Sequence, residues 1–331
     1  MAKQVVVLGA DNERTRNLMG RYRTLVAQNG DAVDLKFVNA DGGPDRIVQE
    51  SRDAIAIIPA MPRVLTTDVV RQLPNLKLIQ TTSAGTDWID KPAVYELGVK
   101  VANNGGGNRV AVSEHTITLM VAAYRKLDHQ IRSAKSGQWS SDVPGVPEDF
   151  HTLEEKTVGI VGLGRIGRAV AKRLQGWDCE IVYNDVIDIP KEVEQELHAS
   201  RLSLDELLAA SDVVTLHVPL EQTTYHMISE REFGLMKKTA ILINACRGPV
   251  VDEPALIEAL EAGQIAGAAL DVLEQEPTRP DNPLLSMQNV VVTPHNASRA
   301  IESMLTSTKF AIENVSRLAR GEEPDSLVPP V

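Results

Sequence analysis

The chain has 331 residues, of which 43% are hydrophobic and 24% are charged, and its formal net charge is −11. This length exceeds what one hydrophobic core usually organises, so we expect two domains. The acidic balance argues against nucleic-acid and membrane partners, because phosphate backbones and anionic lipid heads would be repelled.

The N-terminal residues lead directly into the apolar run Val5–Leu8, which is too short for the core of a signal peptide. No stretch of about eighteen apolar residues occurs in the sequence. Cys179 and Cys246 are too few for a disulfide framework, and no CxxC pair indicates zinc. We therefore expect a cytoplasmic protein without a membrane segment and without a metal.

Short apolar runs rich in Val and Ile recur between amphipathic stretches. This alternation predicts an α/β protein whose parallel sheets are covered by helices on both faces. In the first third of the chain the runs are Val5–Leu8, Ala54–Ile58 and Leu76–Gln80. Beyond residue 150 they are Val158–Val161, Ile181–Tyr183, Val213–Leu216, Ala240–Ile243, Ala268–Val272 and Val290–Val292.

Two segments, Asn103–Asn108 and Thr293–Ser298, each precede a long helical pattern and are predicted to join the domains. The first pattern runs from about Ala111 to Lys135, and the second reaches Arg320. We expect residues 1–103 plus 298–331 to form one domain and residues 104–297 to form the other. Within the latter, the proline-rich stretch Val143–Pro147 is predicted to be a surface loop.

A glycine fingerprint, GxGxxG, lies between an apolar strand and a helix. Gly162 permits the tight turn, Gly164 lets the backbone approach a pyrophosphate, and Gly167 lets helix and strand pack closely. The start of the helix, at Arg165 and Ile166, offers backbone amide groups to the phosphates. Residues 104–297 are therefore predicted to be the dinucleotide-binding domain.

Asp185 follows the next apolar run after the fingerprint. A carboxylate at this place accepts the ribose hydroxyls of NAD and repels the 2′-phosphate of NADP. The residues that follow, Val186–Asp188, include no arginine that would bind that phosphate. The expected cofactor is therefore NAD.

Ionisable residues follow three later apolar runs, in the segments Asn244–Gly248, Asp271–Pro277 and Thr293–Asn296. Ligands of open α/β sheets gather beyond the carboxyl ends of the strands. We therefore expect an arginine, a glutamate and a histidine from these segments to converge on one cleft.

Three further motifs and the glycine fingerprint accompany these segments in a specific order along the chain. They are Ser83–Asp87, Ala111–His115, the fingerprint Gly162–Gly167, and His217–Leu220 with Thr224. Together the motifs resemble the D-isomer-specific 2-hydroxyacid dehydrogenases, which include phosphoglycerate, glycerate and D-lactate dehydrogenases and the related formate dehydrogenases. The resemblance covers almost the whole chain. It implies two Rossmann-like domains, a doubly wound parallel-sheet NAD-binding domain and a flavodoxin-like substrate domain.

The resemblance also implies a catalytic set of Arg247, Glu276 and His295. Arg247 would clamp the substrate carboxylate, for which a guanidinium has matched donors. His295 would be the general acid in reduction and the general base in oxidation. Glu276 would bind the other imidazole nitrogen and raise the pKa of His295. Glu274 lies nearby, but Glu276 is chosen because Pro277 follows it.

The resemblance implies further residues that contact the cofactor and the substrate. Asp271 would hold the nicotinamide carboxamide, and the other predicted cofactor contacts are Val218, Pro219, Thr224, Ala245 and Cys246. The substrate would contact Ala84, the Gly85 backbone amide and Asn108 in addition to Arg247. His115 and His217 are interpreted as structural, and a catalytic thiol is not expected.

The substrate is predicted to be a small unphosphorylated 2-oxo acid such as glyoxylate, hydroxypyruvate or pyruvate. The uncharged stretch Ile58–Met61 offers little positive charge for a phosphate, although phosphoglycerate stays possible. Formate dehydrogenases carry glutamine where this chain has Glu276, which favours proton transfer at a carbonyl or alcohol. The proline spacing of Pro59–Thr66 and Asn108 nevertheless resemble the formate branch.

Two alternatives stay open at this point. One is a formate dehydrogenase-like enzyme, which an assay with formate would reveal. The other is a non-catalytic, NAD-binding docking protein of the corepressor type, which would bind peptides without dehydrogenase activity. Phosphite oxidation is not expected, because Ala84 stands where that branch carries lysine. The resemblance also implies a homodimer.

Overall fold

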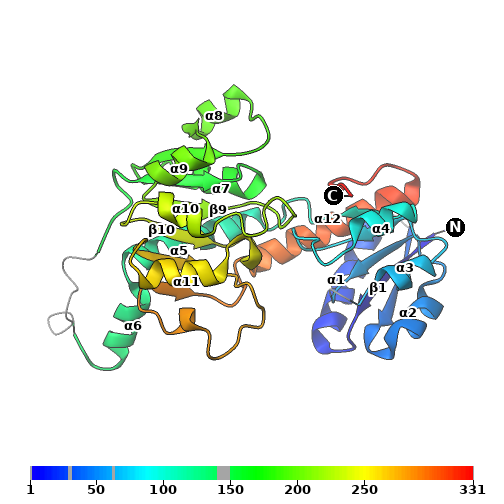
Figure 1. Cartoon of the computed structure of the whole chain (residues 1–331). Coiled ribbons are helices and arrows are strands. Elements are labelled where there is room, and N and C mark those ends of the chain that lie inside the picture. The colour runs from blue at the N-terminus through cyan, green and yellow to red at the C-terminus, as the bar shows by residue number, and fades with distance from the viewer. Residues whose placement is uncertain (1, 29–31, 62–63, 140–149, 331) are drawn as a thin grey trace. The chain divides into compact units, whose positions relative to one another are not determined.

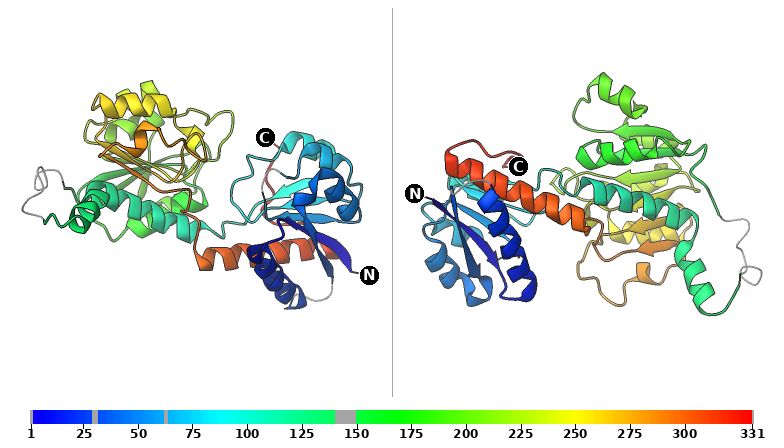
Figure 2. Two further views of the ribbon diagram at one scale, coloured as in Figure 1. Left: turned by 90° about the horizontal axis from the view of Figure 1, so that it is seen from below. Right: turned by 180° about the vertical axis from the view of Figure 1, so that it is seen from behind.

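The chain folds into two α/β units, each built around one parallel sheet (Figures 1 and 2). One unit comprises Met1–Asn108 and Ala300–Val331, and the other comprises Arg109–Arg299. This computed structural model describes residues 2–28, 32–61, 64–139 and 150–330. The stretch Val143–Pro147, and Pro62 and Arg63 of the Pro59–Thr66 motif, lie outside the described residues. Among the described residues, no helix combines the length and apolar character needed to cross a bilayer.

Within the described residues, the first unit has a five-stranded parallel sheet in the order β2-β1-β3-β4-β5, the flavodoxin-like order. Its strands are β1 (Lys3–Gly9), β2 (Val33–Asn39), β3 (Ala56–Pro59), β4 (Leu78–Gln80) and β5 (Lys100–Ala102). Its helices are α1 (Glu13–Gln28), α2 (Gly43–Ser51), α3 (Thr67–Arg71), α4 (Lys91–Glu96) and α12 (Ile301–Arg320), with a short 3-10 turn at Ala40–Gly42.

Alternate residues of β1 face opposite layers of helices. Val5 and Val7 belong to the core that includes residues of α1 and α12, whereas Val6 and Leu8 pack with residues of α2, α3 and α4. All four side chains are completely buried. The strand is apolar throughout because neither face of the sheet reaches solvent, as predicted for a covered parallel sheet.

The second unit, over its described residues, has a seven-stranded parallel sheet in the order β12-β11-β10-β9-β6-β7-β8. This is the doubly wound Rossmann order with one more strand at the β12 edge. The strands are β6 (Thr157–Val161), β7 (Glu180–Asn184), β8 (Ala199–Arg201), β9 (Val213–Leu216), β10 (Ile241–Asn244), β11 (Gly267–Leu270) and β12 (Val290–Val292). The expected pair of α/β folds is confirmed.

Helices cover both faces of this second sheet. Residues of α5 (Arg109–Tyr124), α7 (Arg165–Leu174) and α8 (Lys191–Leu197) share one core, and residues of α9 (Leu204–Ala210), α10 (Glu230–Leu235) and α11 (Glu253–Glu261) share the other. Helix α9 begins with the Ser203 capping box, in which Glu206 Oε2 accepts from the Ser203 amide at 3.0 Å. Short 3-10 turns lie at Gly248–Val250 and Pro283–Leu285.

Three strands were not among the predicted runs, namely β2, β5 and β8, and each lies at the edge of its sheet. An edge strand is exposed along one side, so polar residues are tolerated and the apolar run is broken. In β8 only Ala199 is buried, whereas Ser200 and Arg201 are exposed. Hydrophobic patterning therefore located the central strands and missed these three edge strands.

The predicted single helix from about Ala111 to Lys135 is wrong. The chain forms α5 and then α6 (Leu127–Lys135), separated at Lys126, whose φ of 45° is left-handed. Helix α5 is buried against the sheet and ends at Tyr124, whereas Ser133 is the buried residue of α6. The helix breaks where it leaves the sheet, and neither glycine nor proline marks that position.

Candidate active site

Three loops of the second unit leave the same edge of its sheet. Strands β10, β11 and β12 are parallel neighbours, with Asn244 opposite Leu270 and Leu270 opposite Val292. The segments that carry Arg247, Glu276 and His295 follow directly after these strand ends. The predicted convergence of the three segments is therefore a consequence of the parallel register.

The Arg247 turn is shaped by Asn244, a residue to which no role was assigned from sequence. Its Nδ2 donates to the Arg247 carbonyl at 2.9 Å, and its Oδ1 accepts from the Cys246 amide at 3.0 Å. At Gly248, a Cβ atom would lie 1.9 Å from the Leu273 carbonyl oxygen, so a side chain here would displace one of the two loops. Glycine thus lets the Arg247 turn contact the segment that carries Glu276.

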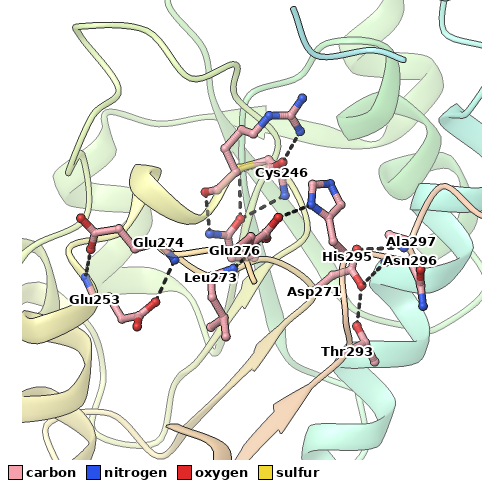
Figure 3. Close-up of polar contacts among 12 residues, drawn as sticks. Cys246, Glu253, Asp271, Leu273, Glu274, Glu276, Thr293, His295, Asn296 and Ala297 are labelled. Atoms are coloured by element: carbon pink, nitrogen blue, oxygen red, sulfur yellow. Dashed lines mark hydrogen bonds and ion pairs between the residues drawn. The ribbon is translucent and has the colours of Figure 1, made fainter. Parts of the chain in front are cut away.

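His295 and Glu276 form a direct pair (Figure 3). The Nδ1 atom of His295 lies 2.6 Å from Glu276 Oε2, and Glu276 Oε1 accepts from the Leu273 amide at 3.1 Å. Because an ionised carboxylate only accepts, Nδ1 carries the proton and the imidazole tautomer is set. The Nε2 atom is then the nitrogen that can exchange a proton with a ligand.

The pairing of His295 with Glu276 shifts the pKa values of both side chains. The hydrogen bond to Glu276 raises the pKa of His295 above its usual value, although burial and the nearby Arg247 charge act in the opposite direction. Burial tends to raise the pKa of Glu276, but the His295 and Leu273 hydrogen bonds and the Arg247 charge outweigh it and lower that pKa. A cationic imidazole is therefore stabilised beside an ionised carboxylate.

The two glutamates of this loop have separate histidine partners. Glu274 Oε1 lies 3.0 Å from His226 Nε2, and Glu274 Oε2 accepts from the Glu253 amide at 3.2 Å. Figure 3 shows Glu274 directed toward Glu253 and Glu276 directed toward His295. The geometry therefore distinguishes two glutamates that the sequence left easy to confuse.

Asp271 holds the turn that presents His295. Its carboxylate is 1% exposed and accepts from the backbone amides of Asn296 and Ala297 at 2.9 and 2.8 Å. The Asp271 carbonyl also accepts from the His295 amide at 2.7 Å. His295 has a left-handed φ of 52°, a conformation that costs a non-glycine residue about 1 kcal/mol or more. These bonds stabilise that strained turn.

A side-chain relay joins this turn to helix α5. Thr293 Oγ1 donates to Asp271 Oδ1 at 2.6 Å, and His115 Nε2 lies 3.0 Å from Thr293 Oγ1. Burial tends to raise the pKa of Asp271, but the hydrogen bonds from His115, Thr293 and the loop amides lower it. His115 therefore supports the His295 turn, and the relay through Thr293 was not recognised from the sequence.

The glycine fingerprint adopts a geometry that suits a dinucleotide. Gly162 has a φ of 94°, and a Cβ on Gly167 would lie 2.1 Å from the Gly162 carbonyl oxygen. By contrast, a Cβ on Gly164 would meet no atom within 4 Å, and Gly164 is the N-cap residue of α7, which has no side-chain cap. Two glycines are therefore required by the fold, whereas Gly164 leaves open space over the start of the helix, at Arg165 and Ile166.

Asp185 lies beside this turn. Its Oδ2 accepts from the Leu163 amide at 2.7 Å and its Oδ1 accepts from the Ile187 amide at 2.9 Å. The sequence argument that no arginine accompanies Asp185 is incomplete, because Arg201 Nη2 donates to the Asp185 carbonyl at 2.8 Å. Arg201 comes from β8, an edge strand that hydrophobic patterning did not find.

Other predicted cofactor residues border the glycine turn or the Arg247 turn. The Val218 side chain lies 3.1 Å from where a Gly162 Cβ would be. Thr224 Oγ1 donates to the Pro219 carbonyl at 2.6 Å and orders that loop. Cys246 and Ala245 precede Arg247, and burial raises the pKa of the Cys246 thiol to about 11. The thiol is thus protonated at neutral pH and unsuited to nucleophilic catalysis.

The predicted substrate residues of the first unit lie in loops after β4 and β5. Ser83 Oγ donates to the Gly85 carbonyl at 2.8 Å, and the Ser83 carbonyl accepts from the Asn104 amide at 3.1 Å. Ala84 and Gly85 are half-buried in this loop. Asn108 is buried, and its Oδ1 has no hydrogen-bond partner among the described residues. Both loops leave the carboxyl edge of their sheet.

The site and its fold have clear counterparts among known proteins. Residues 117–297 match the family model described as D-isomer specific 2-hydroxyacid dehydrogenase, NAD binding domain. The chain belongs to the D-isomer specific 2-hydroxyacid dehydrogenase family. The resemblance stated from the motifs is therefore confirmed. This dehydrogenase is an oxidoreductase with a nicotinamide cofactor, and the docking-protein alternative is set aside.

Relatives of the dehydrogenase cover most of its length. It is 43% identical to a glyoxylate reductase of Thermofilum pendens over 86% of this chain and 84% of the relative. It is 38% identical to a D-3-phosphoglycerate dehydrogenase of Archaeoglobus fulgidus over 84% of this chain and 52% of that protein. The crystal structure of a glyoxylate reductase from Paecilomyes thermophila matches with a TM-score of 0.85 and 30% identity over 99% of both chains.

The residues around the glycine turn of the dehydrogenase fit a dinucleotide. Where the structure describes the chain, no three His, Cys, Asp or Glu side chains are grouped so as to hold a metal ion. The open space at Gly164 and the uncapped start of α7 fit the phosphates of a dinucleotide. Asp185, beside that turn, fits the adenosine ribose.

Replacing Glu276 with glutamine tests the electrostatic part of the pair. The substituted amide can still accept the Nδ1 hydrogen bond but has no charge, so the pKa of His295 is expected to fall. As the predicted acid, His295 must be protonated for reduction of a 2-oxo acid, so activity in this direction should be lost at lower pH in the variant than in the wild type. As the predicted base, His295 must be neutral for oxidation of the hydroxy acid, so activity in that direction should persist to lower pH. Full pH profiles of kcat in both directions measure this, and unmoved profiles would contradict the assigned pairing.

Proposed function

We propose that this dehydrogenase interconverts a small unphosphorylated 2-oxo acid and the corresponding D-2-hydroxy acid, with glyoxylate or hydroxypyruvate as substrate and NAD(H) as cofactor. The observation that carries the proposal is the 2.6 Å pair of His295 and Glu276 beside Arg247. An ionised glutamate at this position favours a histidine that exchanges protons, which a carbonyl or alcohol substrate requires and formate does not.

In the proposed reaction, the nicotinamide supplies the hydride in reduction and accepts it in oxidation. Arg247 binds the substrate carboxylate through paired donors and orients the adjacent carbonyl. His295 donates its Nε2 proton to the carbonyl oxygen in reduction and removes the hydroxyl proton in oxidation. Glu276 retains the Nδ1 proton and stabilises the cation. Asp271 positions His295 through its turn, in addition to its predicted contact with the carboxamide.

One unit is proposed to bind the cofactor and the other to contact the substrate. The unit Arg109–Arg299 would bind NAD through the glycine turn, Asp185 and the loops at Val218–Thr224 and Ala245–Cys246. The unit of Met1–Asn108 and Ala300–Val331 would bind the substrate through the Gly85 amide, Ala84 and Asn108. The unpartnered Oδ1 of Asn108 supports this role, because a buried amide oxygen usually has a hydrogen-bond partner. The homodimer and the cytoplasmic location stay predictions.

A panel assay tests the proposed substrate class. Oxidation of NADH would be followed with glyoxylate, hydroxypyruvate, pyruvate and phosphohydroxypyruvate, and reduction of NAD would be followed with formate. We expect the highest kcat/KM with glyoxylate or hydroxypyruvate. The name of the Thermofilum pendens relative supports this order. Turnover of formate comparable to that of the 2-oxo acids would contradict the Glu276 argument. A preference for phosphohydroxypyruvate would show that the enzyme acts on phosphorylated substrates.

A further inference from the structure

An arginine lies beside the acid that is proposed to take the adenosine ribose. Arg201 ends the edge strand β8 and lies opposite Tyr183 of β7 in the parallel register. Strand β8 follows helix α8 in the chain, and this helix is labelled in Figure 1. Its Nη2 donates to the Asp185 carbonyl at 2.8 Å, while its Nη1 pairs with Asp188. The guanidinium is thus held at the same turn as the Asp185 carboxylate.

This position is chemically suited to a 2′-phosphate. Dinucleotide sites that accept NADP place an arginine near the ribose, where a carboxylate would otherwise bind the 2′-hydroxyl. A guanidinium binds phosphate oxygens through two parallel charge-assisted bonds. Two carboxylates oppose such binding here, because Asp185 carries negative charge at the ribose position and Asp188 pairs with Nη1 of Arg201.

We propose that Arg201 is a specificity-determining residue whose guanidinium is placed to bind a 2′-phosphate. In the wild type, Asp188 pairs with this guanidinium and the charge of Asp185 repels the phosphate. The inference rests on the proposed NAD site at Asp185. The Asp188 side chain is 95% exposed and the Arg201 side chain is 38% exposed. Ion pairs between exposed side chains hold their partners weakly. Removing the Asp188 charge would therefore release the guanidinium for a phosphate, and removing the Asp185 charge would reduce the repulsion of that phosphate.

Binding of cofactor fragments tests Arg201 apart from hydride transfer. ADP-ribose and 2′-phospho-ADP-ribose differ by the 2′-phosphate and carry no nicotinamide. Calorimetry would measure the Kd of each fragment for three proteins. These are the wild type, the double variant Asp185→Asn/Asp188→Asn, and the double variant with Arg201→Gln added. Asparagine in place of Asp185 keeps the shape and one acceptor oxygen. Arg231→Gln in the double variant is the matched control, since Arg231 is also exposed and paired with an aspartate, Asp205.

We expect the double variant to bind 2′-phospho-ADP-ribose at least about tenfold more tightly than the wild type. Adding Arg201→Gln should remove about tenfold of that affinity, whereas adding Arg231→Gln should remove less than about twofold. The ratio of kcat/KM for NADPH over NADH should change in the same order. An affinity of the double variant that is insensitive to Arg201→Gln would overturn the proposal.

ADP-ribose separates this outcome from a failure of the cofactor site itself. We expect wild-type enzyme to bind ADP-ribose, and Arg201→Gln in the double variant to leave that affinity nearly unchanged. Loss of ADP-ribose and 2′-phospho-ADP-ribose binding in parallel would assign Arg201 to the shape of the Asp185 turn and overturn its role in specificity. Absence of ADP-ribose binding to the wild type would overturn the proposed NAD site at Asp185.

Discussion

Replacing His295 with glutamine is expected to lower kcat for 2-oxo acid reduction by about 10²–10⁴-fold, the usual cost of a lost acid–base catalyst. Glutamine can bond to Glu276 but cannot deliver a proton at neutral pH. The glycine turn and Asp185 are untouched, so the Kd for NADH should change little. Steady-state kinetics and NADH fluorescence titration measure the two quantities separately.

The chain offers a matched control for this variant. His226 has the same kind of pairing, 3.0 Å from Glu274, and its partner lies two residues from Glu276 in the same loop. His226→Gln should retain most of the turnover if His295 alone exchanges the substrate proton. Similar losses in the two variants would mean that histidine–glutamate pairs act by holding the loop, and the assignment of His295 as acid would fail.

Replacing Arg247 with alanine is expected to lower kcat/KM by about 10²–10⁴-fold, because two charge-assisted bonds of about 1.5–3 kcal/mol each are lost. KM should rise because the clamp binds the substrate carboxylate, and kcat should fall because the clamp also orients the adjacent carbonyl for hydride transfer. Arg247→Lys should recover only part of the loss, because an ammonium lacks the planar fork.

The pH dependence gives this variant a second, independent signature. The Arg247 charge lowers the pKa of His295, so its removal should raise that pKa further. Reduction should then persist to higher pH in Arg247→Ala, which is the opposite direction from Glu276→Gln. Arg231→Ala removes one positive charge from an exposed pair with Asp205 and should move neither KM nor the profile. An unchanged KM in Arg247→Ala would exclude the carboxylate clamp.

The sequence by itself determined the fold class and the glycine fingerprint, and it named the polar residues that follow β10, β11 and β12. Buried parallel strands must be apolar on both faces, so every predicted run overlaps a strand. The fingerprint was readable for a similar reason. Its conformations, a φ of 94° at Gly162 and a backbone contact at Gly167, admit hardly any residue except glycine. Local sequence was sufficient wherever one residue type alone satisfies the geometry.

Tertiary structure decided which polar groups meet. Only parallel register places the ends of β10, β11 and β12 together, and only the folded loop assigns Glu276 to His295 and Glu274 to His226. Likewise, Arg201 reaches Asp185 because β8 pairs with β7 at an edge where apolar patterning is weak. A hydrogen bond depends on distance and direction in space, and neither is encoded in the spacing of two residues along the chain.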